Sequence, residues 1–344
     1  MRKKTKKRKI GCGTFLLLFI IAYVTVALLP KPQSYEGQNY MMKESDLPIL
    51  IAHGGGNKEF PDNTLEAFYN AYSVDERVMM ETDVSITADG VVILSHDTTL
   101  DRKTNVTGAI AEWNYSDLVA NEVDFGYTNP TSGGKLDGDR KKFTNPDGIE
   151  VTPLDVEYPG GVYARHDSVF LATTLEELIV SFPENRINVE IKQSGEVGKR
   201  AFAEVVRLLQ DHEAFDRVVL ASFHSEIYDE FKEWKKDGRV PENFMFSPGT
   251  SGVVTYFALY TLRLDLFFRD EICVLQIPME EYGIKLAKAG LVKNAHKHNI
   301  AVHYWTINDP EDMRYLIDIG ADGIMTDYPH RLAEVYEQYR AEHQ

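Results

Sequence analysis

Eight short runs of apolar and β-branched residues, most of them followed by a stretch long enough for an amphipathic helix, limit what this chain can fold into. Such alternation favours a parallel sheet whose strands are connected by helices. About eight strand–helix units predict an α/β fold, a (β/α)8 barrel of the TIM type. A doubly wound sheet is the alternative, but Gly54-Gly55-Gly56 alone is too weak to be a dinucleotide fingerprint. The predicted strands are Ile49–His53, Val78–Val84, Ile187–Ile191, Val218–Phe223, Phe244–Ser247, Val274–Ile277, Ala301–Thr306 and Gly323–Thr326.

Three segments of the predicted barrel domain, residues 48–340, depart from this alternation. The turn Ala88-Asp89-Gly90 predicts a hairpin that adds a short antiparallel arm after the second strand. Residues 124–170 are rich in Gly, Asp, Pro and Asn, which predicts an inserted loop or subdomain. Residues 253–268 are unusually apolar and aromatic, so they form either a buried barrel helix or a face that contacts a membrane.

The N-terminal region has the pattern of a membrane anchor. Residues 1–9 form a strongly basic tip, and residues 10–29 contain no charged residue. As a helix, residues 10–29 would span about 30 Å, the thickness of the hydrocarbon core of a bilayer. The basic flank predicts a single-pass helix in the cell membrane, with the N-terminus cytoplasmic and the catalytic domain outside. A cleaved signal peptide is the alternative. Residues 30–47 are predicted to form a polar linker.

Charge and cysteine content limit the classes of partner. The net charge is −16, and the seven cations in residues 2–9 leave −23 on the rest of the chain. Such an acidic body argues against nucleic acid as a partner, because phosphate backbones need a distributed basic surface. Of the two cysteines, Cys12 precedes the apolar run and Cys273 is alone outside, so we expect no disulfide within the external domain.

Acidic residues gather at the ends of two predicted strands. Glu81 and Asp83 are two residues apart and therefore point to the same face of their strand, and Glu190 and Lys192 repeat the spacing on the next. Carboxylates that share a barrel interior need a cation or a proton between them. Glu81, Asp83 and Glu190 therefore predict a site for one divalent cation, Mg²⁺ or Ca²⁺. The alternative for each acid alone is a solvated strand end.

Two histidines also stand where predicted strands end. His53 ends the first strand and His96 ends the hairpin arm. Imidazole titrates near neutral pH, so the two side chains are candidates for general base and general acid. With a carboxylate-bound cation, they indicate phosphoryl or acyl hydrolysis, in which Lys192 would hold an anionic phosphodiester. The glycines that begin at Gly54 would let the backbone approach that substrate.

Similarity to the glycerophosphodiester phosphodiesterases is carried, in chain order, by the motifs AHGGG…PDNTLEAF, METDVSITADGVVILSHD, DRKTNVTG, TTLEEL, NVEIK, WTIND and GADGIMTDYP. The resemblance runs from about residue 49 to residue 330. It implies a TIM-type barrel and metal-dependent hydrolysis of a glycerophosphodiester, a small molecule or one derived from a lipid, to glycerol phosphate and an alcohol. The site residues it implies are the acid/base pair His53 and His96, the metal ligands Glu81, Asp83 and Glu190, the anion contact Lys192, and Trp305 in the pocket wall.

The chain departs from the family pattern at two positions. Gly54 stands where the family usually has an arginine that would hold the phosphate, which leaves Lys58 or Arg102 as substitutes, and Asp62 stands where a glutamate is common. A non-catalytic, membrane-tethered binding protein on the same barrel is therefore an alternative function, and a lysophospholipase D-type activity is another. Attack by water and attack by a hydroxyl of the substrate both remain open.

Overall fold

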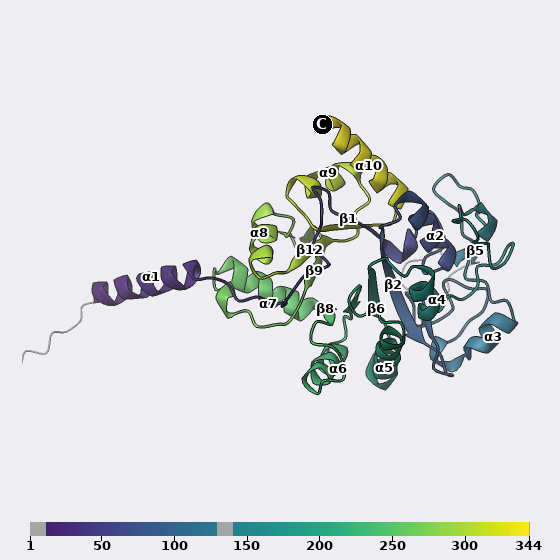
Figure 1. Cartoon of the computed structure of the whole chain (residues 1–344), viewed down its shortest axis with the longest axis horizontal. Helices are drawn as coiled ribbons and strands as arrows, with labels where there is room; N and C mark the ends of the chain where they lie inside the picture. Colours follow the sequence, from purple (N-terminus) through teal and green to yellow (C-terminus); the bar gives the residue numbers. More distant parts are fainter. Residues whose placement is uncertain (1–11, 129–139, 344) are drawn as a thin grey trace, which may run out of the picture.

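A parallel β-barrel surrounded by helices forms the body of the chain, in a computed structural model that describes residues 12–128 and 140–343 (Figure 1). All eight predicted strands are present, although several begin or end a few residues from the predicted bounds. They are β1 (Ile49–Ala52), β2 (Met79–Ile86), β6 (Ile187–Ile191), β7 (Val218–Ala221), β8 (Met245–Ser247), β9 (Val274–Ile277), β12 (Ala301–Tyr304) and β13 (Gly323–Thr326). The prediction of a TIM-type (β/α)8 barrel is therefore confirmed.

The order of the strands leaves one seam in the barrel. Hydrogen-bonded neighbours follow the order β8-β7-β6-β2-β1-β13-β12-β9, and each neighbouring pair is parallel. The two end strands, β8 and β9, lie together, and the Cys273 backbone N–H donates to the carbonyl of Phe246 across the seam at 3.3 Å. The sheet is therefore nearly closed, and few backbone groups are left as an exposed edge.

Helices cover the outside of the barrel between successive strands (Figure 1). Two of them begin with side-chain caps: Thr64 accepts a hydrogen bond from the Ala67 backbone N–H, and Thr174 forms a capping box with Glu177. These caps satisfy N–H groups that the first helical turn leaves unpaired. The helices of the ring are α2 (Leu65–Val74), α4 (Leu175–Ser181), α5 (Gly195–Asp211), α6 (Ser225–Lys236), α7 (Thr250–Thr261), α8 (Ala289–Lys297), α9 (Pro310–Asp318) and α10 (Pro329–Glu342).

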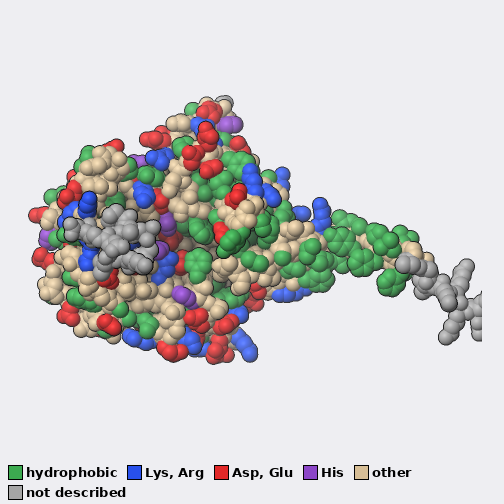
Figure 2. All heavy atoms as spheres, turned by 180° about the vertical axis from the view of Figure 1, so that it is seen from behind, with side chains coloured by type: hydrophobic (Ala, Val, Ile, Leu, Met, Phe, Trp, Pro, Cys, Tyr) green, Lys and Arg blue, Asp and Glu red, His purple; other side chains and the backbone are tan. Residues whose placement is uncertain are grey.

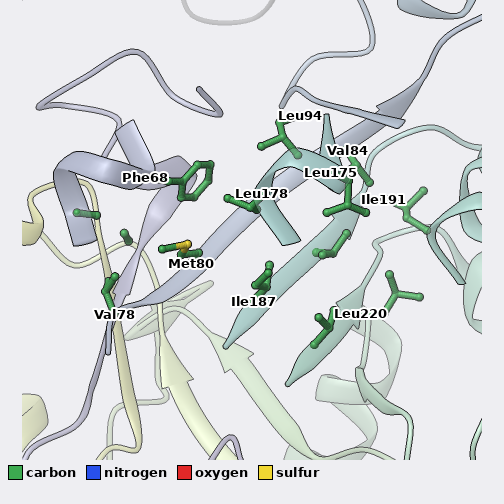
Figure 3. Close-up of a cluster of buried hydrophobic side chains, with 14 of the residues drawn as sticks. Phe68, Val78, Met80, Val84, Leu94, Leu175, Leu178, Ile187, Ile191 and Leu220 are labelled. Carbon is green, nitrogen blue, oxygen red and sulfur yellow. The ribbon is translucent and has the colours of Figure 1, made fainter. Parts of the chain in front are cut away.

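The alternation of side chains along each strand separates two cores. On β2, Met80 and Val84 face outward and pack with helix residues such as Phe68 and Leu178 (Figure 3). Met79, on the other face of the same strand, belongs to a second cluster that fills the barrel interior. Burying each such side chain contributes about 1.5–3 kcal/mol, so both faces of the sheet stabilise the barrel. Inward positions nearer the carboxyl ends of the strands are left for polar side chains.

The predicted hairpin and insertion both follow β2. Strand β3 (Val92–Leu94) pairs antiparallel with β2, so the hairpin prediction at residues 88–90 is confirmed. Arg165 fastens the insertion to the barrel, because its guanidinium contacts Glu66 on α2 and Glu177 on α4. The short elements of this region and of the β9–α8 loop are η2 (Ile110–Glu112), α3 (Tyr115–Ala120), β4 (Tyr127–Thr128), β5 (Lys141–Lys142), η3 (Pro153–Asp155), β10 (Glu280–Glu281) and β11 (Ile284–Lys285).

Residues 30–47, predicted as a polar linker, differ from a free linker. They lie across the amino-terminal end of the barrel, where Tyr35 and Met41 are buried in the interior cluster. The Asn39 amide donates to the carbonyls of Cys273 and Asn299 at 2.7 and 2.8 Å, so it joins the segments that lead into β9 and β12. Polar side chains of residues 30–47 are needed for these bonds to backbone carbonyls. Hydropathy alone does not distinguish such bonds from contact with water.

Helix α1 (Cys12–Leu28) lies within the predicted anchor, residues 10–29, and projects from the barrel beside α7 (Figure 1). The basic tip, residues 1–9, lies outside the described residues. Among the described helices, none combines the length and the hydropathy that crossing a membrane requires. Of the two alternatives for residues 253–268, neither alone describes α7, because Tyr256 is buried whereas Val254 is 60% exposed.

Candidate active site

A cavity of about 980 Å³ opens at the carboxyl ends of the strands, where the active sites of such barrels lie. Both predicted catalytic histidines, His53 and His96, line it, together with Lys192. The insertion contributes part of the wall through Phe143 and Asn145. The sequence pattern of polar strand ends therefore does converge on one cavity.

Three carboxylates meet beside this cavity, and one of them, Asp83, lines it. One oxygen each from Glu81, Asp83 and Glu190 lies within 4.8 Å of the others. The strand register explains the cluster, because Asp83 on β2 is paired with Glu190 on β6, and Glu81 precedes Asp83 on the same face. Glu81 is 3% exposed and Asp83 is 2% exposed, so bulk water does not solvate these charges.

The electrostatics of the cluster favour a bound cation. Burial and the neighbouring charge of Asp83 raise the pKa of Glu81, and burial also raises the pKa of Glu190 although Lys192 opposes it. A raised pKa means that nearby positive charge does not fully compensate the ionised form of that carboxylate. Lys192 supplies one cation, with its Nζ 2.9 Å from both Asp83 and Glu190. An all-oxygen donor set with surplus negative charge fits a hard divalent ion such as Mg²⁺ or Ca²⁺.

His53 is oriented by Asp327, which follows β13. The Nδ1 of His53 lies 2.7 Å from Oδ1 of Asp327, and the Asn308 amide donates to the other carboxylate oxygen at 2.8 Å. Burial lowers the pKa of His53, but the bond to Asp327 and the nearby charge of Glu81 outweigh this and raise it to about 9. An ionised carboxylate only accepts hydrogen bonds, so Nδ1 carries a proton and Nε2 is the nitrogen left for chemistry.

His96 has a matching arrangement on the hairpin side. Its Nδ1 lies 2.9 Å from Oδ1 of Asp97, and the Arg102 Nε donates to the other oxygen of Asp97 at 2.6 Å. The imidazole of His96 is half exposed, whereas that of His53 is more enclosed. Each histidine is thus held by a carboxylate through Nδ1, and the two rings differ in their access to water.

Gly54 occupies a backbone conformation that favours glycine. Its φ is +55°, and a Cβ atom there would lie 3.0 Å from Cβ of Asp62. Its backbone N–H donates to Oε2 of Glu81 at 2.8 Å, so this amide orients an acidic residue of the cluster. Glu81 thus occupies this donor, whereas Gly54 itself lines the cavity, so its predicted approach to the substrate stays a prediction.

The loop from Asp62 to Asn63 supports the site from behind, and the sequence reasoning assigned it no such role. Asn63 donates from its amide to Oδ2 of Asp83 at 3.1 Å and accepts from the Asp83 backbone N–H at 3.0 Å. Asp62 contacts both Arg102 and the buried ammonium of Lys103. Residue spacing along the sequence does not predict such contacts, because the partners are separated by about 20 to 40 residues.

Replacement of Lys103 by methionine should destabilise the protein at neutral pH. Burial raises the pKa of Asp62, but the charges of Lys103 and Arg102 outweigh this and hold it well below its usual range. Breaking a buried ion pair costs about 3 kcal/mol or more, to be measured by urea unfolding at pH 7. The stability that comes from a depressed carboxyl pKa is present above about pH 4 and is lost as the pH falls further.

The difference between wild type and Lys103→Met should therefore shrink as the pH falls below about 4, where Asp62 begins to lose its charge. Lys232→Met is the matched control, because Lys232 pairs with Asp229 on the surface of α6 with both side chains exposed. Exposed pairs contribute about 0–1 kcal/mol, so the control should unfold nearly like wild type. Equal losses in the two variants would contradict the buried pair.

The structure places Trp305, predicted in the pocket wall, beside the barrel interior. It is not among the described residues that line the cavity, and it packs against the interior cluster that contains Met325 and Tyr35. Its position directly after β12 explains this packing, because the indole continues the inward face of the strand. Its place in the pocket wall stays a prediction.

Asp327→Asn should lower the pKa of His53 from about 9 toward its ordinary value near 6.5. The variant removes the negative charge that favours the imidazolium, whereas burial, which lowers the pKa, remains. An NMR titration of the His53 imidazole in the chelator-treated chain would measure the shift. Asp318→Asn, on the exposed face of α9, is the control and should leave the titration unchanged. An unaltered His53 titration in Asp327→Asn would refute this pairing.

Taken together, the structure is a β/α-barrel in which two carboxylate-held histidines lie beside an acidic cluster that offers a donor set for a metal ion. The profile of the glycerophosphoryl diester phosphodiesterase family matches residues 53–331. The chain therefore belongs to the glycerophosphoryl diester phosphodiesterase family, and it is an enzyme of the phosphodiesterase class.

Similar proteins agree with this assignment. The lysophospholipase D GDPD1 of Rattus norvegicus is 27% identical over 314 residues, which cover 85% of this chain and 87% of the relative. The glycerophosphodiester phosphodiesterase of Bacillus altitudinis is 22% identical, with 85% of this chain and 99% of the relative covered. Among solved structures, an Oleispira antarctica phosphodiesterase in complex with the product sn-glycerol-3-phosphate has a TM-score of 0.58 at 20% identity, covering 85% of this chain and 97% of that one.

Proposed function

We propose that the chain hydrolyses glycerophosphodiesters to glycerol phosphate and an alcohol, with one divalent cation and with His53 and His96 as the acid/base pair. The observation that carries the proposal is the meeting of Glu81, Asp83 and Glu190 within 4.8 Å, with Asp83 lining the same cavity as both histidines. The names of the Bacillus altitudinis relative and of the Oleispira antarctica complex support this substrate class.

The acidic cluster would hold the cation, which supplies positive charge to a phosphodiester and to the charge that develops on its oxygens. Lys192 is placed beside the cluster and would hold the same anion from the cavity side. Its ammonium is strongly basic, because the charges of Asp83 and Glu190 outweigh the effect of burial and hold its pKa above the usual range. Lys192 therefore stays charged at any physiological pH.

The two histidines would divide the proton transfers. A pKa raised by Asp327 makes His53 protonated at neutral pH when the cluster lacks a cation, and a cation there would counter the carboxylate charges that contribute to the rise. His96 is more exposed and can exchange its proton with water. One imidazole accepts the proton of the attacking oxygen and the other donates a proton to the leaving alcohol.

Lysophospholipase D-type activity is the second candidate. Relatives with that name in Rattus norvegicus and Homo sapiens cover 85–87% of this chain. It would use the same phosphoryl chemistry on a substrate with an acyl chain, and the cavity of about 980 Å³ has room beyond the acidic cluster. The two activities would therefore share the catalytic groups and differ in the substrate that fits against the part of the cavity wall formed by the insertion.

We further propose that residues 10–29, of which α1 is the described part, attach the chain to the cell membrane as a single-pass anchor, with the N-terminus cytoplasmic and the barrel outside. The helix contains no charged residue, and its large side chains are exposed, with Phe15 72% and Phe19 65% accessible. The basic residues that precede it favour this orientation. A membrane would cover apolar surface that water otherwise meets.

A product assay on the full chain in detergent tests the catalytic proposal. Glycerophosphocholine, glycerophosphoethanolamine and lysophosphatidylcholine are each incubated with Mg²⁺ or Ca²⁺, and release of glycerol phosphate or lysophosphatidic acid is followed. We expect turnover that chelator abolishes and added cation restores. Binding without turnover on all three substrates would favour the non-catalytic alternative. Preference for lysophosphatidylcholine would favour the second candidate.

A further inference from the structure

The end of α7 and the turn η4 (Asp265–Phe267) carry an exposed surface that the catalytic site does not use. Leu262 is 56% exposed and Phe267 is 54% exposed, and the exposed cations Arg263 and Arg269 stand beside them. Neither arginine forms an ion pair with a carboxylate among the residues that the structure describes, although Arg269 donates to the carbonyls of Leu266 and Phe268 at 2.7 Å. Apolar side chains between cations whose charge no carboxylate neutralises are the composition of a surface that meets anionic lipid.

Helix α1 joins the barrel at this same place. The Tyr23 hydroxyl donates to the carbonyl of Leu262 at 2.9 Å, and the Lys31 ammonium reaches both Asp265 in η4 at 3.2 Å and the Ala27 carbonyl at the end of α1 at 3.3 Å. Figure 2 shows hydrophobic side chains of α1 running into this part of the barrel, with Lys and Arg side chains next to them. The apolar surface of α1 and that of the α7 end are thus adjacent.

The connection is fixed by the segment that crosses the barrel end. Asp265 also accepts from the Asn294 amide at 3.1 Å and contacts His298 at 3.2 Å, and His298 is bonded in turn to the Pro32 carbonyl at 2.9 Å. The Ser34 hydroxyl donates to the Asp270 carbonyl at 2.8 Å. A bilayer that holds α1 therefore also brings the α7 end to its surface.

We propose that Leu262, Arg263, Phe267 and Arg269 form a bilayer-contact surface that seats the barrel on anionic lipid beside α1. The inference rests on the proposed membrane attachment of α1 and adds a second contact to it. Leu262 and Phe267 enter the interfacial region, and the two arginines meet lipid phosphates.

This surface lies at the amino-terminal end of the barrel, because α7 starts after β8 on the cavity side and runs back along the outside. The cavity is at the opposite end, at the carboxyl ends of the strands. Substrate therefore reaches the cavity from water, and the substrate class that suits the attached enzyme is a soluble glycerophosphodiester.

Tryptophan fluorescence of the full chain in vesicles tests the contact. Phe267→Trp and the control Tyr282→Trp, whose position is 94% exposed on the β10–β11 hairpin, are reconstituted into phosphatidylcholine–phosphatidylglycerol vesicles with and without brominated acyl chains. After subtraction of the native tryptophan signal, Phe267→Trp should emit at shorter wavelength and be quenched by the brominated lipid. The control should show neither change. Adding Arg263→Glu and Arg269→Glu to Phe267→Trp should reduce the quenching.

Each result separates the two proposals. If the chain does not float with the vesicles, both membrane attachment and the contact surface are refuted. If it floats and Phe267→Trp is quenched no more than Tyr282→Trp, attachment stands and the surface is refuted. A blue shift that appears without lipid as protein concentration rises would indicate contact between copies and overturn the proposal. Turnover of lysophosphatidylcholine relative to glycerophosphocholine should fall from detergent to vesicles, and a rise would contradict the orientation.

Discussion

His53→Asn should reduce kcat by about 10²–10⁴-fold while leaving the barrel folded, because loss of a positioned acid/base group costs that range. The imidazole lines the cavity, is held by Asp327 through Nδ1, and leaves Nε2 for proton transfer. Asparagine keeps a polar side chain at this position, so the adjoining backbone should keep its conformation. Steady-state hydrolysis of glycerophosphocholine, with circular dichroism to verify folding, would measure the effect.

His330→Asn is the matched control for this variant. His330 also contacts a carboxylate through Nδ1, Glu59 at 2.7 Å, but it lies on α10 and does not line the cavity. Its loss should leave kcat within the scatter of the wild type. His96→Asn should resemble His53→Asn, since His96 has the same kind of carboxylate partner in the same cavity. A His53→Asn enzyme that retains full kcat would remove His53 from the reaction.

Glu81→Gln should weaken binding of the divalent cation by at least roughly 10–100-fold, the cost known even for residues one step removed from a metal. The cluster loses one of its three carboxylates. The Gly54 backbone N–H, which donates to Glu81 in the wild type, can donate to the amide oxygen of the glutamine. Isothermal titration of Mg²⁺ and Ca²⁺ into the chelator-treated chain measures the affinity without relying on activity.

The control for Glu81→Gln is Glu280→Gln on the exposed strand β10, which also removes one negative charge. It separates loss of a ligand from a change in overall charge. Cation affinity that is equal in the two variants would exclude Glu81 as a ligand. Loss of affinity in Glu81→Gln alone, together with lost turnover that high cation concentration restores, would locate the cation at the cluster.

The sequence predicted the parts of the site that depend on spacing along one strand or between neighbouring strands. Glu81 and Asp83 share a face because strands alternate, and Glu190 joins them because β6 pairs with β2. The positions of His53 and His96 followed from where apolar runs end. Such patterns report which face a residue occupies, and in a barrel the polar carboxyl ends of the strands share one mouth.

Contacts between segments that are distant in the sequence could not be predicted from such patterns. Asp327 lies in the motif GADGIMTDYP, but its bond to His53 depends on β13 lying next to β1, which only closure of the sheet establishes. The support that Asn63 gives Asp83 depends on how a loop folds back. Trp305 continues the inward face of β12, and whether it lines the pocket or fills the barrel depends on the depth of the cavity.

Strand periodicity, turn residues and the order of polar strand ends determined by themselves that this chain forms a β/α-barrel with an acidic cluster between two histidines. Only the tertiary structure decided which carboxylate holds each histidine, that residues 30–47 close the barrel, and that the α7 end lies beside α1. The physical reason is that periodicity acts through neighbouring residues, whereas these contacts arise where the closed sheet brings segments hundreds of residues apart to hydrogen-bonding distance.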